Sequence, residues 1–303
     1  MKYQSALAWL IPLIALLALV CIVAGLWPGE GTPYPITNFR GEAVTINARG
    51  LYYYDTVSSA AQMQANDFIA LVVGMPLLAV STWLAFRGSL RGRLLLSGTL
   101  GFFLYTYMSM SFNTAFNSLF LVYVVLFALS LLAFILSLLA FDLDSLPAVF
   151  SPRLPRGWIS ALLFVIAAFL TLAWVGGRIA PTWQGTIPQM ENTTTMVIQA
   201  MDLALVTPLC FLGALLLLRR SPWGYLLSAV AVMKGLTMGL AVSTMGINLA
   251  LQGEPDSAII VGMFVLITLA NLVMAVVLLR HVSDQPAVRV HPRHAARPAP
   301  VRG

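Results

Sequence analysis

Lys234, with Asp202 and Asp67, is the one place where this sequence hints at chemistry. Lys234 falls near the middle of the apolar stretch Trp223–Gly246. A charge at the depth of a bilayer costs roughly 3 kcal/mol or more, so it usually has a partner and often a function. Paired with a carboxylate, this ammonium could bind a polar or anionic group, relay protons, or only fix helix packing. The three residues are therefore the candidate ligand or ion-pair site.

The spacing along two helices favours a pair between Lys234 and Asp202. At 1.5 Å per residue, Lys234 lies about 18 Å from the Gly246 end of its stretch. Asp202 lies about 7 Å from Val197, which is expected on the same side of the membrane. A lysine side chain can extend several ångströms toward an interface, so the remaining gap suits an ion pair between neighbouring helices.

Both aspartates also have a simpler explanation. Each is expected in the first turns of its helix, where the helix dipole and free N–H groups stabilise a carboxylate. Pro76 and Pro208 fall inside apolar stretches and are expected to kink them. Beside Lys234, small residues recur at every fourth position and predict a close helix–helix contact. They are Ala231, Gly235, Gly239 and Ser243.

A further set of polar residues could line an outward-facing cavity or hydrogen-bond between helices. Most of them lie toward the end of the third apolar stretch. The set is Tyr105, Thr106, Tyr107, Ser109, Ser111 and Asn113, with Asn117, Asn248 and Asn271.

The motifs by which many enzymes and metal sites are recognised are missing from the sequence. The three histidines all follow the last apolar stretch, which argues against haem or a transition metal held by buried imidazole. Cys21 and Cys210 lie inside apolar stretches and indicate neither a disulfide framework nor a metal site. No Walker loop, HExxH, GxSxG or CxxC motif occurs. We therefore predict no enzyme, no catalytic residue, no metal and no cofactor.

The composition is that of a membrane protein. Of 303 residues, 59% are hydrophobic and 9% charged, whereas charged residues make up about a quarter of a soluble domain. About 20 helical residues cross the hydrocarbon core of a bilayer. Eight stretches are long enough and predict an all-α polytopic fold with eight transmembrane helices. They are Ala6–Trp27, Asp67–Phe86, Leu94–Phe112, Leu119–Phe141, Trp158–Gly177, Val197–Leu218, Trp223–Gly246 and Ala258–Leu279.

The positions of the basic residues predict the orientation. With both termini cytoplasmic, the inner segments hold thirteen lysines and arginines, and the outer segments hold only Arg40, Arg49 and Arg178. The net charge of +6 is then explained by basic loops beside anionic lipid, without a nucleic-acid partner. The bacterial inner (plasma) membrane is the predicted location.

The chain also reads as two halves built on the same plan. Residues 1–141 form a first four-helix half, 142–157 an inner linker and 158–280 a second four-helix half. In both halves a Gln-Ala-x-Asp sequence is followed by a proline and, eleven residues later, by an arginine. Four helices per unit give a tandem 4+4 repeat of parallel topology. The alternative is that apolar helices with short basic turns resemble one another by default.

Two segments lie outside the bilayer in this scheme. The outer segment 28–66 contains Ala43–Asn47, a short run with β-propensity. It predicts a small cap, for which a hairpin lying on the helix ends is one form. The tail 281–303 is rich in proline, arginine and histidine and is expected to be a disordered basic terminus.

Three segments resemble a group of uncharacterised bacterial multi-pass membrane proteins. They are Gly50–Asp55, Gln64–Asp67 and Arg87–Leu96, and the likeness covers about residues 50–141. No activity is known for the group. The resemblance implies the membrane class and a bacterial envelope setting, and it adds no function.

Two functions remain open at this level. A permease or small-molecule binding protein would hold a polar site between the halves. A non-catalytic accessory or assembly subunit would use the same polar groups for packing, and would meet a membrane-protein partner or a second copy of itself. The lipid bilayer is the partner common to both.

Overall fold

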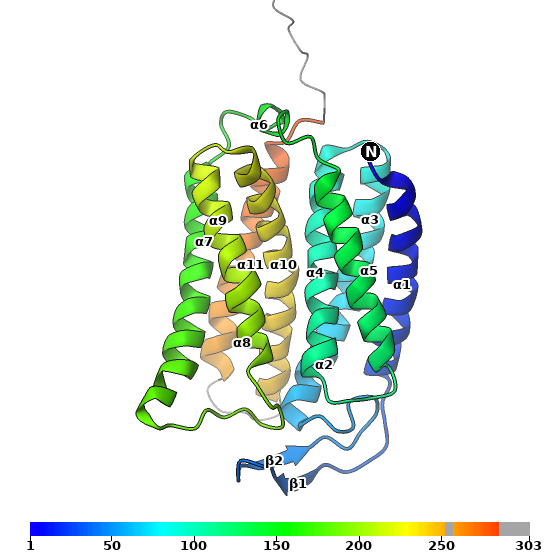
Figure 1. Cartoon of the computed structure of the whole chain (residues 1–303), viewed down its shortest axis with the longest axis vertical. Coiled ribbons are helices and arrows are strands. Elements are labelled where there is room, and N and C mark those ends of the chain that lie inside the picture. Colours follow the sequence, from blue (N-terminus) through cyan, green and yellow to red (C-terminus); the bar gives the residue numbers. More distant parts are fainter. Residues whose placement is uncertain (252–256, 285–303) are drawn as a thin grey trace, which may run out of the picture.

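The computed structural model describes residues 1–251 and 257–284, with side chains placed for all of these except 249–260. It is a bundle of long, roughly parallel helices (Figure 1). The predicted basic tail lies outside the described residues from 285 onward. The first half holds α1 (Gln4–Leu26), α2 (Val57–Ile69), η1 (Ala70–Gly74), α3 (Met75–Phe86), α4 (Leu90–Asn113) and α5 (Phe120–Leu139). The remainder holds α6 (Leu146–Val149), α7 (Arg156–Thr171), η2 (Leu172–Ile179), η3 (Ala180–Gln184), α8 (Val197–Met201), η4 (Asp202–Val206), α9 (Thr207–Leu218), α10 (Pro222–Leu251) and α11 (Ser257–Arg280).

Seven helices of the described chain are long and apolar enough to cross a membrane. This establishes a multi-pass membrane protein whose helices lie in a lipid bilayer. The eighth predicted span is α4, which has 24 residues but is not among the seven. Its sequence mixes leucine and phenylalanine with serine, threonine, tyrosine and glycine, so its mean apolar character is lower. Eight spans therefore stay a prediction.

Both ends of the described chain lie at the same end of the bundle (Figure 1). We call this the terminal end, and the opposite end, which carries the strands, the cap end. At the terminal end the linker is tied to the residues after α11 by a bridge between Phe150 and Val282. There Asp284 accepts hydrogen bonds from the backbone N–H groups of Leu90 and Arg91 at 2.7 and 3.2 Å. These contacts fix the start of α4 against the end of α11.

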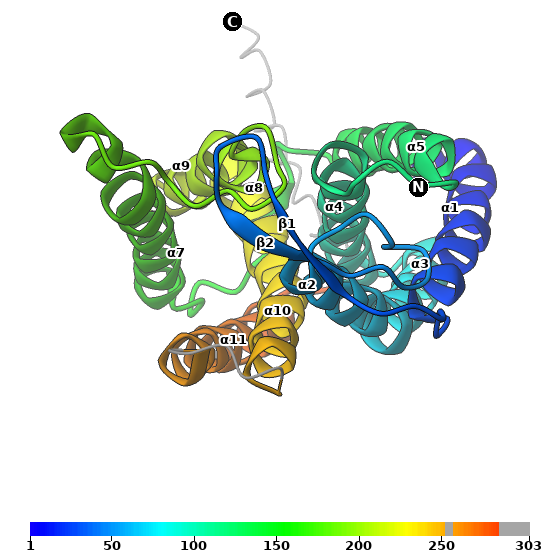
Figure 2. The same cartoon turned by 90° about the horizontal axis from the view of Figure 1, so that it is seen from below.

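The cap contains the predicted hairpin. β1 (Tyr34–Thr37) pairs antiparallel with β2 (Ala43–Ile46) beyond the helix ends. The β-propensity of residues 43–47 is therefore confirmed as a strand over Ala43–Ile46. Seen from the cap end, the hairpin lies across α2 and α8 (Figure 2), which belong to different halves.

α10 is the central helix. Of its most apolar stretch 67% is buried, against 22% to 33% for the other six candidate spans. It packs against α2 and α4 of the first half and against α9 and α11 of the second. The predicted small-residue stripe is its contact with α11, because a Cβ on Gly239 would lie 2.5 Å from Thr268 Oγ1.

Two helices change their winding at the same place. A π-helical segment of five residues, η1 or η4, comes immediately before the turn that holds Pro76 or Pro208. Proline lacks an N–H group and clashes with the carbonyl four residues earlier. The wider π turn places that carbonyl out of the way. At both prolines, where a kink was predicted, the helix thus departs from α geometry through a π segment.

Candidate functional site

A cavity of about 620 Å³ lies between the two halves. The first half contributes side chains from α2 and α4, and the second contributes side chains from α7, η2, α8, η4, α9, α10 and α11. The cavity extends from the cap end, where Asp55 and Glu191 line it, to Lys234 and Asn271 within the bundle. Five of the polar residues predicted to line a cavity do so: Tyr105, Thr106, Ser109, Asn113 and Asn271.

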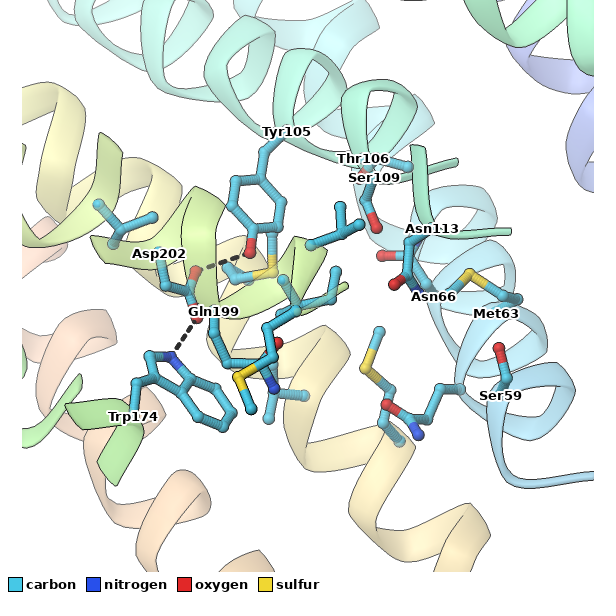
Figure 3. A pocket seen from close by; sticks show the side chains of 18 of the residues that line it. Ser59, Met63, Asn66, Tyr105, Thr106, Ser109, Asn113, Trp174, Gln199 and Asp202 are labelled. Atoms are coloured by element: carbon cyan, nitrogen blue, oxygen red, sulfur yellow. Dashed lines mark hydrogen bonds between the residues drawn. The ribbon is translucent and has the colours of Figure 1, made fainter. Parts of the chain in front are cut away.

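Asp202 is held by two aromatic side chains inside this cavity (Figure 3). The hydroxyl of Tyr105 donates to Oδ1 at 2.6 Å, and the indole N–H of Trp174 donates to Oδ2 at 2.9 Å. Tyr105 comes from α4, Trp174 from η2 and Asp202 from the first position of η4. The carboxylate thus joins the two halves, and each of its oxygens already has a donor.

Lys234 lies over the face of the same tyrosine. Its ammonium is 4.0 Å from the centroid of the Tyr105 ring, and the side chain is only 7% exposed. A cation over a desolvated aromatic ring gains about 2 kcal/mol. Within the described part of the chain, Lys234 makes no ion pair and its Nζ donates no hydrogen bond.

The predicted direct ion pair between Lys234 and Asp202 is therefore wrong. The two residues are joined through Tyr105, which presents its ring face to the cation and its hydroxyl to the carboxylate. Sequence spacing placed the charges in the same region, but it could not show that an aromatic ring occupies the space between them. The tyrosine was expected only as one polar lining residue among several.

Asp67 does not line this cavity, and its predicted place in the first turn of a helix is wrong. The helix begins at Val57 and is capped by Thr56, whose hydroxyl accepts from the N–H of Ser59. Asp67 lies well inside α2, where it is 3% exposed and accepts a hydrogen bond from the Tyr52 hydroxyl at 2.5 Å. It faces α1 at Gly25, away from Lys234.

Capping also fails for Asp202. It sits close to the start of its helix, as predicted, but α8 begins at Val197 without a side-chain cap. The donors to Asp202 are two side chains from other elements, Tyr105 and Trp174. Trp174 is the residue of this cluster that sequence reasoning missed, since it lies 28 positions before Asp202 in an apolar stretch.

Contacts between the cap and the 186–196 loop of the second half lie at the mouth of the cavity. Arg40 donates to the carbonyl oxygens of Thr193 and Glu191 at 3.0 and 2.8 Å. Asn38 donates to the same Glu191 carbonyl at 2.6 Å, and the Thr56 hydroxyl donates to the Glu191 carboxylate. We call these four contacts the cap latch.

Asp55 sits beside the cap latch with a shifted acidity. It accepts from the Ser59 hydroxyl and from the N–H of Ala115, both at 3.1 Å. Burial raises the pKa of Asp55 to about 6, helped by the charge of Glu191 and opposed by these two hydrogen bonds. One carboxylate oxygen, Oδ2, is buried without a hydrogen-bond partner.

The described residues contain no group of three or more histidine, cysteine, aspartate or glutamate side chains that could hold a metal ion. No known protein family, curated protein or solved structure matches the chain. The chemistry of the cavity must therefore be read from its own side chains. A buried cation, a carboxylate held in place and a wall of hydroxyls and amides can bind and orient a small molecule.

Proposed function

We propose that this protein is a membrane permease or small-molecule binding protein whose ligand enters the cavity from the cap end. The observation that carries the proposal is Lys234, a buried ammonium that faces a large cavity and has no acceptor among the described residues. A protein that needed this charge only for packing would pair it, because an unpaired buried charge is costly. The role we propose is binding or transport, without a chemical reaction.

The path of the chain supports eight spans. The two ends of the described chain lie at the same end of the bundle (Figure 1), and that arrangement takes an even number of crossings. The seven apolar helices together with α4 give such a number. Polar residues on α4 face the cavity or neighbouring helices, where they avoid lipid.

The turns at the terminal end support the cytoplasmic placement of that end. The α3–α4 turn holds Arg87, and the α9–α10 turn holds Arg219 and Arg220. Basic turns of this kind favour the cytoplasmic side, so the cap and the cavity mouth would face outward. In a bacterium this is the outer face of the inner membrane.

The matching π segments favour a tandem duplication. Pro76 follows the start of η1, and Pro208 the start of η4, at the same interval. A shared departure from α geometry at one place is more specific than shared apolar character. In this alignment Asp202 corresponds to Ala70, and Asp67 to Gln199. The two aspartates are then independent, and the charged site belongs to the second half.

The proposal is tested by access to the cavity. In a chain carrying Cys21→Ala and Cys210→Ala, Ser109→Cys places a thiol on the cavity wall. We expect it to react in intact cells with a membrane-impermeant thiol reagent. The matched control Ser130→Cys, on α5 and fully buried, should stay unreactive.

Two results would contradict the proposal. A Ser109 thiol that reacts only after the membrane is permeabilised would reverse the orientation. A thiol that never reacts would remove the open cavity and favour an accessory or assembly subunit, in which the polar groups serve packing.

A further inference from the structure

We propose that the ligand of this cavity is a small organic anion with one negative charge and an apolar or aromatic body. The inference rests on the proposed binding function and adds the chemical class of the ligand. It follows from which hydrogen-bonding groups in the cavity already have partners, and from the kinds of side chain that surround them.

Lys234 is the charged group of the deep part of the cavity that lacks a hydrogen-bond partner among the described residues, and it needs an acceptor; Asn271 Oδ1 and Thr106 Oγ1 also lack a partner there but are neutral. An ammonium group carries three donors and no acceptor, and no oxygen of the described residues accepts from Lys234 Nζ. The tyrosine face stabilises the charge but cannot take these donors as a carboxylate does. A ligand carboxylate would supply both the acceptors and the opposite charge.

Asp202, the carboxylate in the deep part of the cavity, does not need a ligand to supply its hydrogen-bond partners. Both oxygens of Asp202 accept a hydrogen bond, from Tyr105 and from Trp174. A cationic ligand would have to compete with these donors for the remaining lone pairs, and it would approach the ammonium of Lys234. The arrangement therefore favours an anion over a cation.

The number of cations sets the charge of the ligand. Lys234 is the one basic side chain among the described residues that line the deep part of the cavity, and Arg178 lies at the mouth, where it donates to the Gln189 carbonyl. A phosphate or dicarboxylate usually meets several cationic or backbone donors. A single ammonium suits a single carboxylate.

The walls set the body of the ligand. Phe169, Phe264 and Met238 line the cavity along with Trp174. Pockets of a few hundred Å³ that take small molecules are mostly apolar with a few placed polar groups, as this one is. The anionic group would face Lys234, and the apolar remainder would lie against the aromatic and methionine side chains.

The test uses four probes with one carbon skeleton: 3-phenylpropanoate, 3-phenylpropanamide, phenylalanine and 3-phenylpropylamine. Each is added to proteoliposomes holding the full chain with Ser109→Cys in the Cys21→Ala, Cys210→Ala background. The rate of thiol labelling at Ser109→Cys is measured. Thr186→Cys, in an exposed loop, is the control for effects of the probe on the reagent.

We expect 3-phenylpropanoate to slow labelling at a concentration about tenfold lower than the amide, the ratio for a hydrogen bond to a charged group. Lys234→Met should abolish the difference between acid and amide, and Lys234→Arg should keep it. Labelling of Ser109→Cys without probe shows whether each variant still folds with an open cavity.

The remaining outcomes overturn the proposal in distinguishable ways. Stronger protection by phenylalanine would assign a zwitterion held by both charges, and protection by the amine would assign a cation at Asp202. No protection by any probe, with an open cavity, would reject the anion class and leave the proposed function standing. A cavity closed to the reagent would reject both.

Discussion

Tyr105 is the residue on which the site depends, because one side chain serves two charges of opposite sign. Its hydroxyl donates to Asp202 and its ring lies under the ammonium of Lys234. The tyrosine keeps the two charges in one cluster while leaving the lysine donors free. A direct ion pair would have satisfied both charges and left nothing for a ligand.

Two substitutions separate the roles of this tyrosine. Tyr105→Phe keeps the ring and removes the donor to Asp202, and we expect it to lower the free energy of unfolding by about 1–3 kcal/mol. Tyr105→Leu also removes the ring face, which should cost about 1–2 kcal/mol more. Thermal unfolding of the purified protein in one detergent measures both. Equal stability of the two variants would show that the cation–π contact contributes nothing.

Two of the three predicted candidates, Lys234 and Asp202, line the cavity, and their role as ligand residues stays a prediction. An ammonium inside an apolar stretch is conspicuous, so Lys234 could be found by composition alone, and Asp202 by its position near a helix start. Asp67 was misplaced because hydropathy identifies the stretch that crosses lipid, and α2 begins ten residues before that stretch. Trp174 could not be found, since a tryptophan in an apolar helix has many ordinary places to lie.

At the scale of the elements, α1 and α2 approach so closely that only glycine fits between them. A Cβ on Gly25 would lie 2.0 Å from Asp67 Oδ2 and 2.7 Å from the Tyr52 hydroxyl. The carboxylate of Asp67 and the hydroxyl of Tyr52 thus pack against α1 at the position where Gly25 has no side chain. Asp67 does not line the cavity, and this close packing of α1 against α2 explains its buried position.

Gly25→Ala is expected to destabilise the protein by about 1–3 kcal/mol or more, because the added methyl group must push α1 away from Asp67. Gly262→Ala is the matched control, since a Cβ there meets nothing within 4 Å and alanine favours a helix. Thermal unfolding of both variants is the measurement. A Gly25→Ala protein as stable as the control would mean that α1 does not pack as described.

The cap should weaken as the pH rises. Asp55 has an ordinary pKa of 3.8 and a folded-state pKa of about 6, so the folded chain binds more protons between these values. The stabilising effect of the protonated form is complete below pH 3.8 and is lost as the pH rises through 6. The loss amounts to about 3 kcal/mol at neutral pH.

Asp55→Asn should remove this dependence, because the amide cannot ionise. The free energy of unfolding is measured from pH 4 to pH 7 for the variant and the original chain. A slope unchanged by the substitution would assign the pH dependence to another group.

The helices themselves were predicted more closely than their irregularities. The span Val197–Leu218 has the predicted bounds. The other apolar stretches could be found because a run of about twenty apolar residues is seldom anything but a membrane-spanning helix. The π segments could be anticipated only as disturbances at Pro76 and Pro208. Proline shows that a helix must adjust, but the way it adjusts depends on its neighbours.

At the scale of the whole molecule, the cap latch joins one half to the other across the cavity mouth. Arg40 belongs to the first half, and the carbonyl oxygens that it binds belong to the second. Access to the cavity from this side therefore depends on contacts that are far apart in the sequence. No pattern within a single segment could have predicted them.

Arg40→Gln should open this mouth. The amide can replace at most part of the contacts with Glu191 and Thr193, so we expect Ser109→Cys to be labelled several-fold faster than in the parent chain. Arg49→Gln is the matched control on the same segment, since Arg49 donates to Gly31 within the cap. Equal labelling rates in the two variants would mean that the cap latch does not limit entry.

The central place of α10 has a consequence for how the chain is made. A ribosome delivers α2 and α4 to the membrane long before it delivers the helix that covers them, and a Cβ on Gly98 of α4 would touch Met233 of α10 at 2.2 Å. Until α10 is synthesised, the face of α4 that carries hydroxyl groups lacks the helix against which it packs in the folded protein. A fragment ending at residue 141 would thus lack the helix that covers α2 and α4, and we expect it to be less stable than the full chain.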